Sequence, residues 1–126
     1  MSKGRILIAE DFAPAAFVAE EMARELGFDA DVVANGRDAV TRAQANRYVA
    51  ILMDVEMPIM DGIEATALIR KIERTAGFEP NPVIGMTGHT SQGVRVLCQR
   101  AGMDSFLLKP FTVEDLETAL SKVMAG

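Results

Sequence analysis

The sequence predicts an α/β fold in which five parallel β-strands form one sheet with helices on both faces. Two observations support this prediction. Five short apolar runs occur along the 126 residues, and a helical pattern of apolar residues follows each of them. Strands that alternate with helices are joined by right-handed crossovers, so the strands run parallel and helices cover both faces of the sheet.

The predicted strands differ in polarity. Residues 6–9 form a continuous apolar run, which is typical of a strand buried on both faces. Residues 31–33 include an aspartate, so this second strand is expected nearer an edge of the sheet. The other three predicted strands comprise residues 49–53, 82–86 and 105–108.

The first predicted helix has Pro14 in its first turn, carries Val18, Met22 and Leu26 at helical spacing, and stops at Gly27. The second runs from residue 36 to about 45, and the third from 62 to about 75, followed by a loop over 75–81. The apolar stripes of the remaining helices are predicted to be Ala39, Val40 and Ala43; Ile63, Ile69 and Ile72; Val94, Leu97, Cys98 and Ala101; and Val113, Leu116, Leu120 and Val123.

The ends of the last two helices carry recognisable signals. Ser91 is a candidate N-cap for the fourth helix, which Gly102 is expected to stop. Thr112 lies three residues before Asp115, and this spacing resembles a capping box at the start of the fifth helix.

Composition limits the class of protein. The length fits one domain, residues 1–126, and we expect no output domain. A single cysteine excludes an internal disulfide and fits the cytoplasm. We expect no signal peptide, and no apolar run reaches the length that spans a bilayer. The net charge of −5, without a basic patch, argues against nucleic acid as a partner.

Polar residues follow four of the predicted strands. In an open parallel sheet, ligands bind beyond the carboxyl ends of the strands, so these residues should share one rim. They are Glu10 and Asp11 after the first strand, Asp54 after the third, Thr87 and Gly88 after the fourth, and Lys109 and Pro110 after the fifth.

Three carboxylates close together cannot all remain ionised without a compensating charge. Oxygen ligands suit Mg²⁺, which favours sites with one or two carboxylates plus a phosphate. An aspartate can act as the nucleophile toward phosphorus, and preplaced positive charge and hydroxyl groups stabilise the transferred group. The rim therefore predicts a magnesium-dependent phosphoryl-transfer site.

The chain resembles the receiver domain of two-component response regulators over essentially its whole length. Four segments carry the resemblance in the family's order, each at a strand end: residues 6–11 (ILIAED), 52–62 (LMDVEMPIMDG), 85–88 (GMTG) and 108–111 (LKPF). The resemblance implies a flavodoxin-like, doubly wound sheet with the strand order 2-1-3-4-5.

The resemblance also implies a role for each residue of the rim. Asp54 corresponds to the phosphoacceptor. Glu10, Asp11, Asp54 and the main-chain carbonyl of Glu56 correspond to the magnesium ligands, with Glu10 holding a metal-bound water.

Lys109 is expected to pair with Asp54 at rest and with a phosphoryl oxygen afterwards, and its bond to Pro110 is expected to be cis. Thr87 would donate its hydroxyl to the phosphoryl group. Phe106 corresponds to a switch aromatic, with a plain core aromatic as the alternative. Gly88 leaves the site open to water or a partner.

The implied partners are a histidine kinase or histidine phosphotransfer protein, and a downstream protein that reads the face made by the fourth helix, fifth strand and fifth helix. The resemblance also allows a dimer that forms on phosphorylation. A stand-alone regulator and a hybrid-kinase receiver both fit. The domain is expected to be a phosphoacceptor switch that also hydrolyses its own phosphate.

Two other functions share the fold class. An aspartyl phosphatase of the haloacid dehalogenase type requires Asp-x-Asp after the first strand, where this chain has Glu10, Asp11 and Phe12. A flavin-binding module requires a Ser/Thr/Gly-rich loop there, and acids would repel the flavin phosphate. We interpret His89 as an exposed loop residue and Cys98 as core, and a partner contact is the one role we assign to Phe12.

Overall fold

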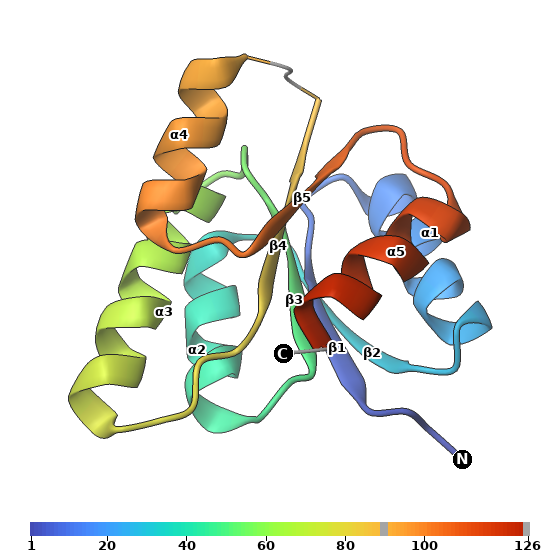
Figure 1. Cartoon of the computed structure of the whole chain (residues 1–126), viewed down its shortest axis with the longest axis horizontal. Coiled ribbons are helices and arrows are strands. Elements are labelled where there is room, and N and C mark those ends of the chain that lie inside the picture. Colours follow the sequence, from blue (N-terminus) through green and yellow to red (C-terminus); the bar gives the residue numbers. More distant parts are fainter. Residues whose placement is uncertain (89–90, 125–126) are drawn as a thin grey trace.

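The computed structural model describes residues 1–88 and 91–124, and its centre is a five-stranded parallel sheet (Figure 1). The strand order is β2-β1-β3-β4-β5, as the sequence predicts. β2 and β5 are the edge strands, which explains the more polar sequence of β2. The strands are β1 (Arg5–Ala9), β2 (Asp29–Val33), β3 (Ala50–Asp54), β4 (Val83–Thr87) and β5 (Ser105–Leu108).

Helices cover both faces of this sheet. In Figure 1, α2, α3 and α4 lie on one side of the sheet and α1 and α5 lie on the other. They are α1 (Ala13–Glu25), α2 (Gly36–Ala45), α3 (Gly62–Ala76), α4 (Gln92–Ala101) and α5 (Val113–Met124). The predicted doubly wound architecture is confirmed.

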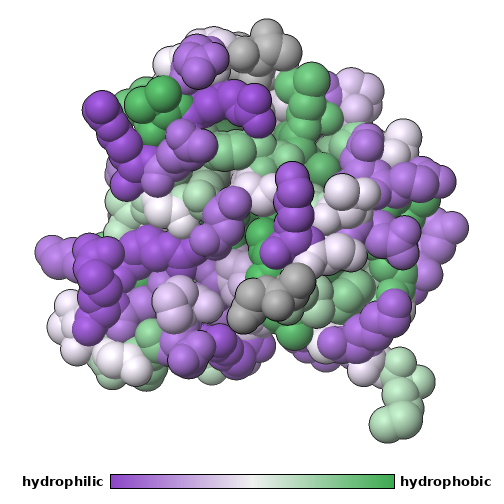
Figure 2. Space-filling model, in the orientation of Figure 1, coloured by the Kyte–Doolittle hydropathy of each residue, from purple (hydrophilic) through white to green (hydrophobic). Residues whose placement is uncertain are grey.

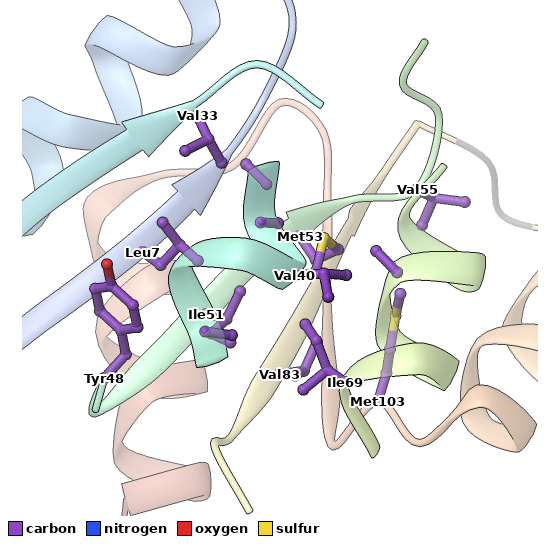
Figure 3. Close-up of a cluster of buried hydrophobic side chains, with 14 of the residues drawn as sticks. Leu7, Val33, Val40, Tyr48, Ile51, Met53, Val55, Ile69, Val83 and Met103 are labelled. Atoms are coloured by element: carbon purple, nitrogen blue, oxygen red, sulfur yellow. The ribbon is translucent and has the colours of Figure 1, made fainter. Parts of the chain in front are cut away.

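The core is divided by the sheet into two clusters, because successive side chains of a strand point to opposite faces. On β1, Ile6 and Ile8 pack with α1 and α5, whereas Leu7 and Ala9 pack toward α2 and α3. Figure 3 shows the second cluster, in which strand residues meet side chains of α2 and α3. The central strands are therefore buried on both faces, as their continuous apolar sequences require.

The capping box of α5 is confirmed. The main-chain N–H of Thr112 donates to a carboxylate oxygen of Asp115 at 3.0 Å, and the N–H of Asp115 donates to the Thr112 hydroxyl at 3.1 Å. Ser91 is the N-cap residue of α4, as predicted, but its side chain makes no capping hydrogen bond.

Two predicted helix faces need correction. On α1, Met22 and Leu26 pack against the core as predicted, but Val18 is 50 % exposed and the buried residues are Ala16, Ala19 and Ala23. Small alanine side chains let α1 approach the sheet closely, and this rotates Val18 outward. On α4, Cys98 is buried as predicted but Leu97 is 52 % exposed.

Close packing at Gly62 joins α3 to the end of β3. A Cβ atom placed on Gly62 would lie 2.1 Å from the main-chain oxygen of Asp54, so no side chain fits there. The Gly62 N–H donates to the carbonyl of Val55 at 2.9 Å. The loop that follows β3 is thus fixed at both ends around Asp54.

The face shown in Figure 2 is mostly hydrophilic, with apolar side chains interspersed. Among the described residues, no helix has both the length and the apolar character needed to cross a bilayer.

Candidate functional site

The predicted site residues meet at the carboxyl edge of the sheet, which we define as the rim where all five parallel strands end. Asp54 and Thr87 are the last residues of β3 and β4, and Glu10 and Lys109 directly follow β1 and β5. The chain adds β2 on one side of β1 and then β3 on the other side, so the strand order reverses between β1 and β3. Ligands bind at such a switch point in this architecture.

Three carboxylates form the centre of the site. Glu10, Asp11 and Asp54 each offer an oxygen, and these oxygens lie within 4.8 Å of one another. Glu10 and Asp54 are buried, at 4 % and 6 % exposed, whereas Asp11 is exposed. The cluster therefore combines two buried carboxylates with one that is open to solvent.

The ammonium group of Lys109 faces this cluster. Its Nζ lies 3.2 Å from Oδ2 of Asp54, the partner predicted for it, and 2.6 Å from Oε1 of Glu10. Glu10 reaches Lys109 because its side chain is one methylene longer than an aspartate. The bond between Lys109 and Pro110 is cis.

This arrangement separates the pKa values of the two buried acids. Burial raises the pKa of Asp54 to about 7, the neighbouring Glu10 adds to the rise, and Lys109 opposes it. Burial is the largest influence on Glu10 and acts to raise its pKa, but hydrogen bonds with Lys109, Asp54 and the Phe12 N–H, together with the charge of Lys109, outweigh it and the pKa is lowered. Burial would lower the pKa of Lys109, yet contacts with both acids raise it. One ammonium thus cannot balance both carboxylates at neutral pH.

Main-chain groups orient the two acids. The N–H of Phe12 donates to Oε2 of Glu10 at 3.2 Å, and the N–H of Glu56 donates to Oδ1 of Asp54 at 3.4 Å. The N–H of Glu10 itself donates to the carbonyl of Val33 on β2 at 3.0 Å. The β1–α1 and β3–α3 loops therefore hold their carboxylates toward each other.

The donor set fits Mg²⁺. The three side chains supply oxygen atoms alone, which are the ligands this hard cation prefers. A divalent cation would also offset the carboxylate charge that Lys109 leaves uncompensated. The role of the Glu56 carbonyl as a further ligand stays a prediction.

The remaining predicted residues surround this centre. Thr87 is buried, and Gly88 is exposed. Phe106 is half-buried and packs against the cluster beneath α3 and α4. Phe12, directly after the acidic pair, is 63 % exposed. His89 lies outside the described residues.

A second polar cluster was not predicted. Arg70 and Glu73 of α3 form an ion pair of 2.7 Å, and Arg70 also pairs with Asp104 at 2.9 Å. Asn81 donates to Glu73 through its main-chain N–H at 2.8 Å. These residues lie at the amino edge of the sheet, where the strands begin. The sequence signal available was Glu73, an acid that lies four residues after Ile69 and directly after Ile72 on the apolar stripe of α3.

Comparison with known proteins agrees with the geometry. The family model of the response regulator receiver domain matches residues 6–121. Histidine kinase 5 of Arabidopsis thaliana is 34 % identical over 98 % of this chain, and the match covers 16 % of that protein. Transcription factor SKN7 of Saccharomyces cerevisiae is 31 % identical over 94 % of this chain and 18 % of its own length. The chain thus spans less than a fifth of these relatives.

A solved structure gives the same assignment. The receiver domain of sensor histidine kinase PA1611 from Pseudomonas aeruginosa PAO1, which has a magnesium ion coordinated in its active-site cleft, is 38 % identical, with a TM-score of 0.88 over 98 % of both chains. These matches do not favour the phosphatase or the flavin-binding alternative. The chain belongs to the family of response regulator receiver domains, the phosphoacceptor switches of two-component and phosphorelay signalling.

Proposed function

We propose that Asp54 is the phosphoacceptor of this receiver domain and that it takes a phosphoryl group from phosphohistidine on a histidine kinase or a histidine phosphotransfer protein. The observation that carries the proposal is the position of Asp54. It is a buried carboxylate at the end of β3, at the β1/β3 switch point, beside Glu10, Asp11 and Lys109.

The side chains of Glu10, Asp11 and Asp54, together with the main-chain carbonyl of Glu56, would hold Mg²⁺. When bound, this ion supplies positive charge against the oxygens of the transferred group. The pKa of about 7 for Asp54 gives the ion a second importance, because a nearby cation favours the ionised, nucleophilic carboxylate.

In the transfer step, an oxygen of Asp54 forms a bond to phosphorus while the bond from phosphorus to the donor imidazole breaks. The imidazole nitrogen keeps the electron pair of that bond. Lys109 exchanges its contacts with the carboxylates for a phosphoryl oxygen, and Thr87 donates its hydroxyl to another. The phosphorylated Asp54 side chain carries about two negative charges, where the ionised carboxylate carried one.

The new charge would change the balance between two arrangements of β4, β5 and the segments that follow them. Thr87 and Lys109 bind the phosphoryl group best in one arrangement, and this preference shifts the equilibrium. Phe106 would follow Thr87 as the switch aromatic. The α4–β5–α5 face would then be read by a downstream protein or by a second copy of the domain.

The setting of the domain is also part of the proposal. The buried free thiol of Cys98 suits the reducing cytoplasm. Hydrolysis of the acyl phosphate by the domain itself would reset the switch. The relatives include both hybrid kinases and a transcription factor, and either a stand-alone regulator or a receiver within a hybrid kinase agrees with this.

Intact-mass measurement after incubation with acetyl phosphate and Mg²⁺ tests the proposal. The wild type should gain one phosphoryl group, and EDTA or Asp54→Asn should abolish the gain. Asp38→Asn, which changes an acid of α2, is the matched control and should still be labelled. Labelling of Asp54→Asn at the wild-type rate would place the acceptor elsewhere.

A further inference from the structure

The ring of Phe106 lies in a slot between β4 and α4. Phe106 pairs with Gly85 in the register of β5 and β4. A Cβ atom on Gly85 would lie 2.6 Å from Sδ of Met103 and 3.3 Å from Cδ1 of the Phe106 ring, so the Met103 side chain and the ring both lie directly beside this glycine. The absence of a side chain at Gly85 opens the space that the ring uses, and Phe106 is half-buried there against the core cluster.

Arg95 of α4 lies over the same ring. Its guanidinium carbon is 5.3 Å from the ring centroid, within the range of a cation–π contact. Phe106 has no hydroxyl group, so no side-chain hydrogen bond can hold its ring in one position. The contact with the guanidinium is therefore the directional interaction that the structure offers to the exposed side of this ring.

α4 is otherwise lightly anchored. Cys98 is its one buried residue among those the structure describes, and Leu97 faces solvent. The helix packs chiefly on α3, and Val94 is partly buried against the core cluster. The contact from Arg95 to Phe106 thus joins the middle of α4 to β5, and these two elements belong to the face that a partner is proposed to read.

We propose that Arg95 is a positioning residue that holds the ring of Phe106 in the slot beside Gly85 and so couples α4 to β5. The coupling would depend on both the length and the charge of the side chain. The contact between Arg95 and Phe106 exists without phosphorylation. The role of the coupling in signalling rests on the proposed function.

The test compares four variants of the whole chain in the unphosphorylated state. Arg95→Ala removes the contact, Arg95→Gln retains much of the length without charge, and Arg95→Lys retains the charge. Arg100→Ala is the matched control, because Arg100 is an exposed arginine in the last turn of the same helix. NMR of ring-labelled phenylalanine reports the position of Phe106, and amide hydrogen exchange reports the opening of α4.

We expect Arg95→Ala and Arg95→Gln to shift the Phe106 ring signals and to speed exchange in the middle of α4 by roughly two- to fivefold. Arg95→Lys should restore part of both effects, and Arg100→Ala should leave the ring signals unchanged. A purely structural role for the arginine side chain would not give charge-dependent rescue. Ring signals and exchange rates that stay at wild-type values in Arg95→Ala would overturn the proposal.

Labelling with acetyl phosphate separates this inference from the proposed function. If the ring signals respond to Arg95 but Asp54 is never labelled, the positioning role is supported and the phosphoacceptor assignment fails. If Asp54 is labelled while Arg95→Ala leaves the ring signals unchanged, the phosphoacceptor assignment is supported and the positioning role fails.

Discussion

The amino edge and the carboxyl edge of the sheet both hold buried charged groups, but the two edges are balanced differently. At the amino edge, Arg70 bonds to the carboxylates of Glu73 and Asp104 and to the carbonyls of Gly102 and Asn81. Glu73 also accepts from Asn81. This cluster has a partner for each charge and joins α3 to the segments that lead into β4 and β5.

At the carboxyl edge, three carboxylates lie close together, and the ammonium of Lys109 pairs with two of them, Glu10 and Asp54. The imbalance appears as a pKa of about 7 for Asp54, whereas the acids of the amino edge are held by hydrogen bonds and an arginine. Buried charge that is fully partnered maintains the fold, and buried charge that lacks compensation awaits a cation or a reaction. Removing a charged group should therefore lower the free energy of unfolding at the amino edge and raise it at the carboxyl edge.

The largest effect is expected from Arg70→Met. The substitution leaves Glu73, whose side chain is 6 % exposed, buried without its cation, and we expect a loss of about 3 kcal/mol in the free energy of unfolding. Urea denaturation measures it. Arg24→Met breaks the exposed ion pair with Glu20 on α1 and serves as the control, with an expected loss below about 0.5 kcal/mol. Equal losses in both variants would contradict the distinction.

The same Asp→Asn substitution should have opposite effects at the two edges. In metal-free protein at pH 8, Asp54→Asn removes a carboxylate that its surroundings oppose, and we expect a gain of roughly 1–3 kcal/mol in the free energy of unfolding. Asp104→Asn weakens the contacts to Arg70 and to the N–H of Val83, so it should destabilise the protein. A destabilising Asp54→Asn would show that the carboxyl edge is already balanced.

The pH dependence of the Asp54 effect follows from its raised pKa. Between the ordinary value near 3.8 and about 7, the folded protein retains a proton that the unfolded chain has released. Stability contributed by this group therefore falls as pH rises through that window. The stability difference between Asp54→Asn and wild type should be near zero below pH 4 and largest above pH 7. Denaturation at several pH values, without metal, would refute this if the difference were flat.

Bound Mg²⁺ should turn the carboxylate cluster from a destabilising into a stabilising part of the fold. At a free concentration ten times its Kd, Mg²⁺ should stabilise the wild type by about 1.4 kcal/mol, because it binds the folded site and not the unfolded chain. The gain should shrink at pH 5, where protons compete for Asp54, and EDTA should remove it. Thermal melts of the wild type and of Asp54→Asn provide the comparison, and the same gain in both proteins would place the cation elsewhere.

How far the sequence predicts these two edges depends on how each is built. The residues of the carboxyl edge directly end or follow strands, and the parallel arrangement brings Glu10, Asp54 and Lys109 together wherever those strands occur. The amino-edge cluster instead joins an interior position of α3 to two loops, so no local pattern marks it. The sequence of residues 75–81 predicts a plain loop and does not indicate that Asn81 bonds to Glu73.

Helix faces show a related limit. On α1, hydrophobicity favoured the stripe with Val18, but the sheet is contacted by Ala16, Ala19 and Ala23. A row of alanines has little apolar area, and its value lies in the close approach that it allows, which only the packed structure reveals. The bond from Lys109 to Glu10 was missed because side-chain reach, not position in the chain, decides it.

Gly88→Val is expected to have the smallest effect on stability, but it should change the lifetime of the phosphoryl group on Asp54. A Cβ atom on Gly88 would meet no atom within 4 Å, so the free energy of unfolding should change by less than about 0.5 kcal/mol. The added isopropyl group would stand beside Thr87 and hinder water from approaching the acyl phosphate. The phosphoryl group on Asp54 should then persist longer than in the wild type, measured by its loss after removal of acetyl phosphate.

Gly77→Val, in the left-handed cap of α3 far from the site, controls for an added valine and should cost stability without changing that lifetime. Hydrolysis that is unchanged or faster in Gly88→Val would show that water reaches Asp54 by another path.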